Sequence, residues 1–337
     1  MTEITSPPLL EIKDLKKFFP VQKGFLRRTV GFVKAVDGVN LTAQTGETLG
    51  IVGESGSGKT TLGRTLLRLY EPSAGEINLR VKGEVVPVSQ LNGNDLRKLR
   101  RSAQMIFQDP YSSLNPRMTV LETVGEPLFV NGIASGREME DRVKEVILQV
   151  GLRVEHLRRY PHSFSGGQRQ RIGIARALVV KPSLIVADEP VSALDVSIQA
   201  QILNLLKDLQ SEYQLTYLFI SHAMNVVRYM CDRIAVMYAG RVVELGTNNQ
   251  VMKTPKHPYT EALLASVPKT TSRYRGTRTI SAGEVPDLAS LPKGCTFHPR
   301  CKYAVDRCKA EVPQLRDIGD GQMASCHRAE ELELKGI

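Results

Sequence analysis

The fold class follows from eight consecutive residues, Gly53-Glu54-Ser55-Gly56-Ser57-Gly58-Lys59-Thr60. They match the P-loop pattern, in which glycines let successive backbone N–H groups turn towards a chain of phosphates. A helix beginning at Lys59 would add the positive end of its dipole. We therefore predict a nucleotide site rather than an ordinary glycine-rich turn, with Lys59 reaching the β- and γ-phosphates and the Thr60 hydroxyl binding Mg²⁺.

The segments on either side of this loop fit a strand, a phosphate loop and a helix. The apolar run Thr48 to Val52 precedes it, and Leu62, Leu66 and Leu69 recur after it at helical spacing until Glu71-Pro72. A second apolar run, Ser183 to Ala187, ends in Asp188-Glu189. Beside a P-loop, Asp188 would hold Mg²⁺ through water and Glu189 would act as general base. The predicted class is α/β.

A second anion site is predicted at Ser165-Gly166-Gly167-Gln168. A serine hydroxyl and two glycine N–H groups at the start of a helix suit a phosphate, although they would equally serve as a helix cap. Because the P-loop already covers one side of a nucleotide, this second site suggests a γ-phosphate held between two surfaces.

The remaining pattern divides the chain into two regions with a boundary near residue 255. Prolines, glycines and cysteines become more frequent after this point. Before it, helical patterns cover Thr119 to Gly151 and Arg169 to Val180, and a basic loop spans Lys23 to Lys34. The further strands that we expect are Leu9 to Leu15, Val36 to Leu41, Tyr217 to Ile220, and a hairpin of Arg233 to Met237 with Arg241 to Glu244.

Composition narrows the class of protein without identifying it. The chain has 337 residues, 42% of them hydrophobic, and a net charge of +10 from 45 basic and 35 acidic residues. This is enough for about two domains and suits anionic partners such as nucleotides, nucleic acid or a membrane face. There is no run of eighteen apolar residues, and Met1 to Pro8 lack the layout of a secretory signal, so we expect a cytoplasmic chain.

Together these motifs resemble the nucleotide-binding subunit of an ATP-binding cassette (ABC) transporter. The resemblance covers nearly the whole chain and implies a mixed-sheet core, an antiparallel β subdomain and a helical subdomain at about 108–180. It implies an ABC domain at 1–255 and a small Cys-rich C-terminal extension at 256–337. Ser165 to Gln168 would be the signature loop, which binds the ATP of a partner subunit.

The resemblance also implies roles for residues outside the P-loop. Gln108 would be the Q-loop glutamine that senses Mg²⁺, and His222 the switch histidine that orients the attacking water. Asp195, in Ser192-Ala193-Leu194-Asp195, would belong to the D-loop. Phe19 would stack on adenine, unless it merely fills the core, with Val36 against the ribose. The implied ATP-binding set is Phe19, Val36, Gly53, Glu54, Ser55, Gly56, Ser57, Gly58, Lys59, Thr60 and Thr61.

Three segments narrow the resemblance to the peptide-permease branch: Phe107 to Met118, Pro190 to Gln199 and His257 to Pro268. Members of this branch import dipeptides, oligopeptides, nickel or oligosaccharides. The chain is most like the second ATPase subunit, called F in dipeptide permeases. The implied partners are a second ATPase subunit (a sister or a second copy), two transmembrane permease subunits and, indirectly, an extracytoplasmic solute-binding protein. The implied location is the cytoplasmic face of the cell membrane.

Four cysteines gather near the C-terminus, at Cys295, Cys301, Cys308 and Cys326. Four soft thiolates suit either a zinc ion or an iron–sulfur cluster, and the spacing lacks the tight knuckle of structural zinc. Similar peptide-permease ATPases are believed to hold a 4Fe-4S cluster. We expect a cluster here over zinc, with unligated thiols as the third alternative, and a structural staple over a redox centre. Cys231 is expected to be a small buried hydrophobe.

Two other classes of function compete with ATP-driven peptide import. One is a soluble ABC ATPase that acts on nucleic acid or ribosomes, for which the net charge of +10 is the argument. Such proteins carry a long coiled coil or two cassettes in one chain, and neither pattern occurs here. The other is a redox or metal sensor that uses the cysteines. We therefore expect an ATPase subunit of a peptide importer, with no nucleic acid as partner.

Overall fold

The computed structural model describes residues 7–24, 28–267 and 287–337, which form two compact units. The first unit contains residues 7–10, 43–47 and 78–219. The second contains the described residues of 11–42, 48–77 and 220–337. Segments far apart in sequence thus share a unit, and the P-loop lies in the same unit as the C-terminal residues.

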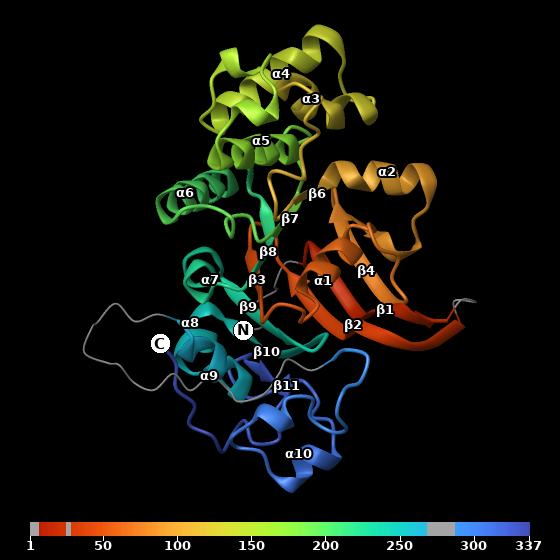
Figure 1. Ribbon diagram of the computed structural model, residues 1–337, viewed down its shortest axis with the longest axis vertical. Helices are drawn as coiled ribbons and strands as arrows, with labels where there is room; N and C mark the ends of the chain where they lie inside the picture. Colours follow the sequence, from red (N-terminus) through yellow and green to blue (C-terminus); the bar gives the residue numbers. More distant parts are fainter. Residues whose placement is uncertain (1–6, 25–27, 268–286) are drawn as a thin grey trace. The chain divides into compact units, whose positions relative to one another are not determined.

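In the second unit, strand β3 (Thr48–Val52) leads into the P-loop, which is followed by α1 (Lys59–Leu66; Figure 1). All five residues of β3 are buried, as expected for an apolar run covered on both faces. β3 pairs in parallel with β9 (Arg233–Tyr238), which forms the predicted antiparallel hairpin with β10 (Arg241–Thr247). The sheet continues through β12 (Met323–Ala324) to β11 (Arg316–Asp317). Segments near both ends of the chain therefore contribute to one sheet.

The helices of the second unit are short. α1 (Lys59–Leu66) begins at the P-loop, and it ends before the predicted Leu69 because Arg68 adopts a left-handed φ of 52°. In the described part of this unit the others are α7 (Met224–Met230), α8 (Asn248–Lys253), α9 (Pro258–Ala265), α10 (Asp306–Ala310) and the 3₁₀ turn His298–Arg300. The domain boundary near residue 255 and the separate Cys-rich extension stay predictions.

The strands near the N-terminus are longer than expected. β1 (Leu10–Lys23) extends well beyond Leu15, and β2 (Arg28–Ala43) begins inside the predicted basic loop. Their outer residues are mostly half-buried in β1 and mostly exposed in β2, so they lack the alternating buried and exposed pattern from which a strand is predicted. Neighbouring strands supply their backbone hydrogen bonds instead, in the order β2-β1-β4. β4 (Ala74–Val81) then pairs antiparallel with β5 (Glu84–Pro87).

The first unit combines a parallel sheet with the predicted helices. β8 (Thr216–Ser221), β7 (Leu184–Asp188) and β6 (Ala103–Ile106) are successive strands, and β6 and β7 run parallel. α3 (Val120–Val130), α4 (Gly136–Gln149) and α5 (Gly166–Leu178) pack together (Figure 1), which confirms the helical patterns in this part of the chain. The other elements are α2 (Gly93–Ser102), α6 (Val196–Tyr213) and the 3₁₀ turns Val88–Gln90, Val154–His156 and Pro161–Ser163.

The apolar faces of these helices explain their packing. In α4, Val143, Val146 and Ile147 are buried, and they lie on one face at spacings of three and four residues. Thr119 and Glu122 form a capping box that starts α3. No helix in the part of the chain that the structure describes is long and apolar enough to span a membrane.

Candidate functional site

The P-loop connects β3 to α1 and folds tightly around its own lysine. Lys59 is only 5% exposed. Its Nζ donates hydrogen bonds to the carbonyl oxygens of Gly53 at 2.8 Å and Glu54 at 2.7 Å. The loop therefore holds a buried positive charge beside the N-terminus of a helix, and both features favour a bound anion.

Gly58 is required by close packing in the same loop. Its φ is 103°, and a Cβ at this position would lie 2.0 Å from the backbone oxygen of Ala35. Gly56 also has a left-handed φ, of 80°, but a Cβ there would meet nothing within 4 Å. Gly58 is therefore required because a side chain would collide with β2, whereas Gly56 is required only because its backbone is left-handed.

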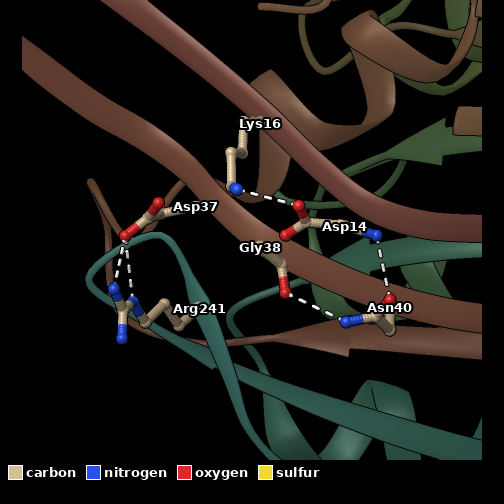
Figure 2. A network of polar contacts seen from close by, with 6 residues as sticks. All are labelled: Asp14, Lys16, Asp37, Gly38, Asn40 and Arg241. Atoms are coloured by element: carbon tan, nitrogen blue, oxygen red, sulfur yellow. Dashed lines mark hydrogen bonds and ion pairs between the residues drawn. The ribbon is translucent and has the colours of Figure 1, made fainter. Parts of the chain in front are cut away.

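An ion pair holds β2 against the turn between β9 and β10 (Figure 2). Both Nε and Nη2 of Arg241 donate to Oδ2 of Asp37, at 3.0 and 2.6 Å. The neighbouring Gly240 accepts a hydrogen bond from the Asp37 N–H and donates one to the backbone oxygen of Ser57. Through Gly240, the P-loop residue Ser57 is linked to β2 and to the β9–β10 hairpin. The sequence did not indicate this role for Asp37 or Arg241.

The two residues expected to contact the nucleoside differ in their surroundings. Phe19 is half-buried and meets Tyr70 edge to face, with ring centroids 5.5 Å apart, while Lys17 Nζ lies 4.8 Å from its ring centre. Part of the Phe19 ring therefore stays available for stacking. Val36 is completely buried, and its contact with a ribose stays a prediction.

The first unit brings Gln108 and Glu189 together. Gln108 Nε2 donates a hydrogen bond of 2.9 Å to Glu189 Oε2. The reason is the topology: Gln108 follows β6 and Glu189 follows β7, and parallel neighbours end at the same edge of a sheet. Asp188, the last residue of β7, is completely buried, whereas the side chain of Glu189 is half-buried.

The predicted signature loop forms the start of α5. The Ser165 hydroxyl accepts a hydrogen bond from the Gln168 N–H, and the Gln168 side chain accepts one from the Ser165 N–H. A Cβ on Gly167 would lie 2.5 Å from Cγ2 of Ile198 in α6, the helix that begins just after Asp195. A Cβ on Gly166 would lie 3.5 Å from Cδ2 of Leu194, so the predicted signature loop and the predicted D-loop lie close together in this unit.

His222 follows β8 directly and is exposed, in the second unit with the P-loop. The structure thus distributes the predicted site residues over both units. Phe19, the P-loop and His222 belong to the second unit. Gln108, Ser165 to Gln168, Asp188, Glu189 and Asp195 belong to the first.

The four C-terminal cysteines line one pocket, together with His257, His298 and His327. Burial raises the pKa of Cys295 and of Cys326 to about 11. Among the described residues, no group of three or more His, Cys, Asp or Glu side chains is placed to hold a metal ion. Cys231 lies apart, buried against Gly50 of β3, which confirms it as a small core residue.

Comparison with known proteins identifies the family. Residues 36–192 match the family described as "ABC transporter", and residues 243–308 match "Oligopeptide/dipeptide transporter, C-terminal region". The oligopeptide transport ATP-binding protein AppF of Bacillus subtilis is 50% identical over 330 residues, which cover 97% of this chain and 99% of the relative. The chain belongs to the ABC transporter family.

Other ABC relatives agree with this assignment. The dipeptide transport ATP-binding protein DppF of Haemophilus influenzae is 47% identical over 319 residues, 95% of this chain and 96% of its own. The dimeric structure of MJ0796, a bacterial ABC transporter cassette, is 32% identical with a TM-score of 0.62 over 71% of this chain and 98% of its own. A second MJ0796 dimer, bound to ADP and Pi, has 32% identity and a TM-score of 0.61, with the same coverage.

Membership of the ABC family confirms the expected P-loop fold of mixed sheet and helices, with ATP and Mg²⁺ as ligands and ATP hydrolysis as activity. The roles of individual residues stay predictions.

Two residues that contact the P-loop, Tyr259 and Arg300, were not predicted to do so. Tyr259 lies in the His257 to Pro268 segment that marks the peptide branch, and Arg300 directly precedes Cys301. Their position in these two segments was the one signal in the sequence that could have marked them as functional residues.

Proposed function

We propose that this ATPase powers the import of dipeptides or oligopeptides through a membrane ABC transporter. The identity of 50% to AppF over nearly the whole chain is the observation that carries the proposal, because AppF is an oligopeptide transport protein by name. Names of this kind recur among the relatives and favour peptides over nickel, oligosaccharides, nucleic acid or ribosomes as the target.

The proposed function assigns separate roles to the residues of the ATP site. Lys59, already aimed into the P-loop, would move to the β- and γ-phosphates, and Thr60, Gln108 and Asp188 would hold Mg²⁺. Glu189 would activate the attacking water as general base. The hydrogen bond from Gln108 would orient the Glu189 carboxylate for this role.

A second ATPase subunit would complete each site. In this arrangement Ser165, Gly166, Gly167 and Gln168 of one subunit would cover the ATP held by the P-loop of the other, with Asp195 at the interface. The amide groups at the start of α5 suit a phosphate in that position. His222 would contact the γ-phosphate. ATP-driven closure would act on two permease subunits from the cytoplasmic face of the membrane, served indirectly by an extracytoplasmic solute-binding protein.

Uptake by intact cells tests this function. Cells whose native copy is replaced by Glu189→Gln should lose uptake of a radiolabelled dipeptide and of a labelled pentapeptide. Uptake of nickel and of a labelled trisaccharide should stay at the level of the parent strain. Normal peptide uptake by the variant, expressed at the parent level, would exclude the proposed function. Loss of nickel or trisaccharide uptake alone would assign that solute instead.

We also propose that the cysteine pocket of a Cys-rich C-terminal extension binds a 4Fe-4S cluster. The donor set fits this group, because four soft thiols line one pocket. A bound cluster would supply folding energy to this part of the chain, as a staple. Cys295, Cys301, Cys308 and Cys326 would be its ligands.

Metal analysis tests the cluster proposal. Protein purified without oxygen should contain about four irons and four acid-labile sulfides per chain, as expected for this cluster type. Both should fall in Cys301→Ser and persist in Cys231→Ser, which alters a cysteine outside the pocket. One zinc per chain without sulfide would replace the cluster by a structural zinc site, and metal-free protein would refute both.

A further inference from the structure

The side chain of Glu54, the second residue of the P-loop, is held by Arg300 from the cysteine-rich C-terminal segment. Arg300 Nη1 lies 2.7 Å from Oε2 and Nη2 lies 2.9 Å from Oε1 of the carboxylate. Two parallel bonds of this kind form a fork that is stronger and more directional than a single ion pair. The Arg300 side chain is 7% exposed and that of Glu54 is 29% exposed, so this fork is partly shielded from water.

The backbone of Glu54 has a second anchor in α9. Its N–H donates a hydrogen bond of 2.7 Å to the hydroxyl of Tyr259. Tyr259 is completely buried and packs against Tyr238 and Phe297, with ring centroids 4.6 and 5.4 Å away. The Arg300 guanidinium lies 5.9 Å from the Tyr238 ring and 5.8 Å from that of Phe297. Both anchors therefore rest on one rigid aromatic cluster.

These contacts bear on the part of the P-loop that faces a nucleotide. The carbonyl oxygen of Glu54 accepts a hydrogen bond from Lys59 Nζ, so the residue that Arg300 and Tyr259 fix also positions the phosphate-binding lysine. A carboxylate so close to a phosphate chain would repel it, and pairing with arginine offsets its charge. The same hydrogen bonds raise the pKa of Arg300 further, so its positive charge persists at every accessible pH.

We propose that Arg300 and Tyr259 are positioning residues for nucleotide binding, through which the C-terminal segment sets the affinity of the P-loop for ATP. This inference rests on the proposed role of the P-loop. It predicts that Arg300 matters because Glu54 is charged. Loss of the arginine should leave the Glu54 charge unpaired beside the phosphates and loosen the loop, which weakens nucleotide binding. Loss of both charges together should weaken binding much less.

A double-mutant cycle on the purified full chain tests the proposal, with the dissociation constant of mant-ATP read by fluorescence. Arg300→Gln should raise this constant about tenfold, the effect of one lost charge-assisted hydrogen bond. In a Glu54→Gln background the same change should raise it about twofold or less. Arg300→Lys, which keeps the charge without the fork, and Tyr259→Phe, which removes the hydroxyl, should give intermediate increases.

The matched control is Lys302→Gln. Lys302 lies in the same segment and forms a 3.1 Å ion pair with Glu261 rather than with the P-loop, so its loss should leave nucleotide affinity unchanged. Lys59→Ala checks the underlying role of the loop: if it still binds mant-ATP normally, the P-loop assignment fails, whatever Arg300 does. If Lys59→Ala abolishes binding but Arg300→Gln has no effect, or has equal effects in both backgrounds, the positioning role is refuted. Thermal unfolding checks that each variant is folded. If Arg300→Gln is unfolded, the nucleotide affinities of Arg300→Lys and Tyr259→Phe test the positioning role in its place: weaker binding supports it and unchanged binding refutes it.

Discussion

A pair of glycine substitutions separates steric from conformational demands in the P-loop. Gly56→Ala places a side chain at a left-handed φ of 80° in open space, and should cost about 1–2 kcal/mol of stability. Gly58→Ala has the same kind of strain at φ 103°, and its Cβ would also lie 2.0 Å from the Ala35 oxygen. Since normal contact needs more than 3 Å, backbone must move by about 1 Å, at a further cost of roughly 1–3 kcal/mol.

The assay is thermal and urea unfolding of both variants without nucleotide. Gly58→Ala should be less stable than Gly56→Ala by about 2 kcal/mol, the middle of the packing cost. For a chain of 337 residues this corresponds to a melting temperature lower by about 3 °C. Equal losses in the two variants would show that the close approach of β2 does not constrain the loop. Nucleotide is left out because an added methyl group could obstruct it directly.

Three further predictions concern catalysis, base stacking and pH. Glu189→Gln should lower ATP turnover by about 10²–10⁴-fold, because it removes a general base. The variant should also form an ATP-bound dimer that is visible by size-exclusion chromatography. Ready release of monomer at saturating ATP would contradict this. Phe19→Ala should weaken mant-ATP binding about tenfold by loss of stacking, with Phe18→Ala as control; equal affinities would return Phe19 to a packing role. Burial raises the pKa of Glu244 to about 7, from 4.5. The folded chain then binds the proton more tightly, so its stability should fall as pH rises from 4.5 to 7, by about 3 kcal/mol relative to Glu244→Gln; parallel pH profiles in urea unfolding would contradict this.

Much of the fold was predictable because its signals are local. The helical patterns at 119–151 and 169–180 and the hairpin around Gly240 rest on residues close together in sequence, and the structure contains them. The ends of elements were less predictable. β1 and β2 extend through half-buried and exposed residues, apolar Val30 and Phe32 among them, whose backbone bonds come from a neighbouring strand, and no periodicity records such a partner.

The sequence by itself determined the ATP site, since the P-loop chemistry needs only a run of glycines with Lys59 and Thr60 at the start of a helix. Tertiary structure alone decided which residues distant in the sequence come together within each unit. Gln108 meets Glu189 across 81 positions because two parallel strands end side by side, and Arg300 meets Glu54 across 246. With 45 basic and 35 acidic residues in the chain, composition allows many pairings. Strand order and the packing of buried aromatic rings select the few that form.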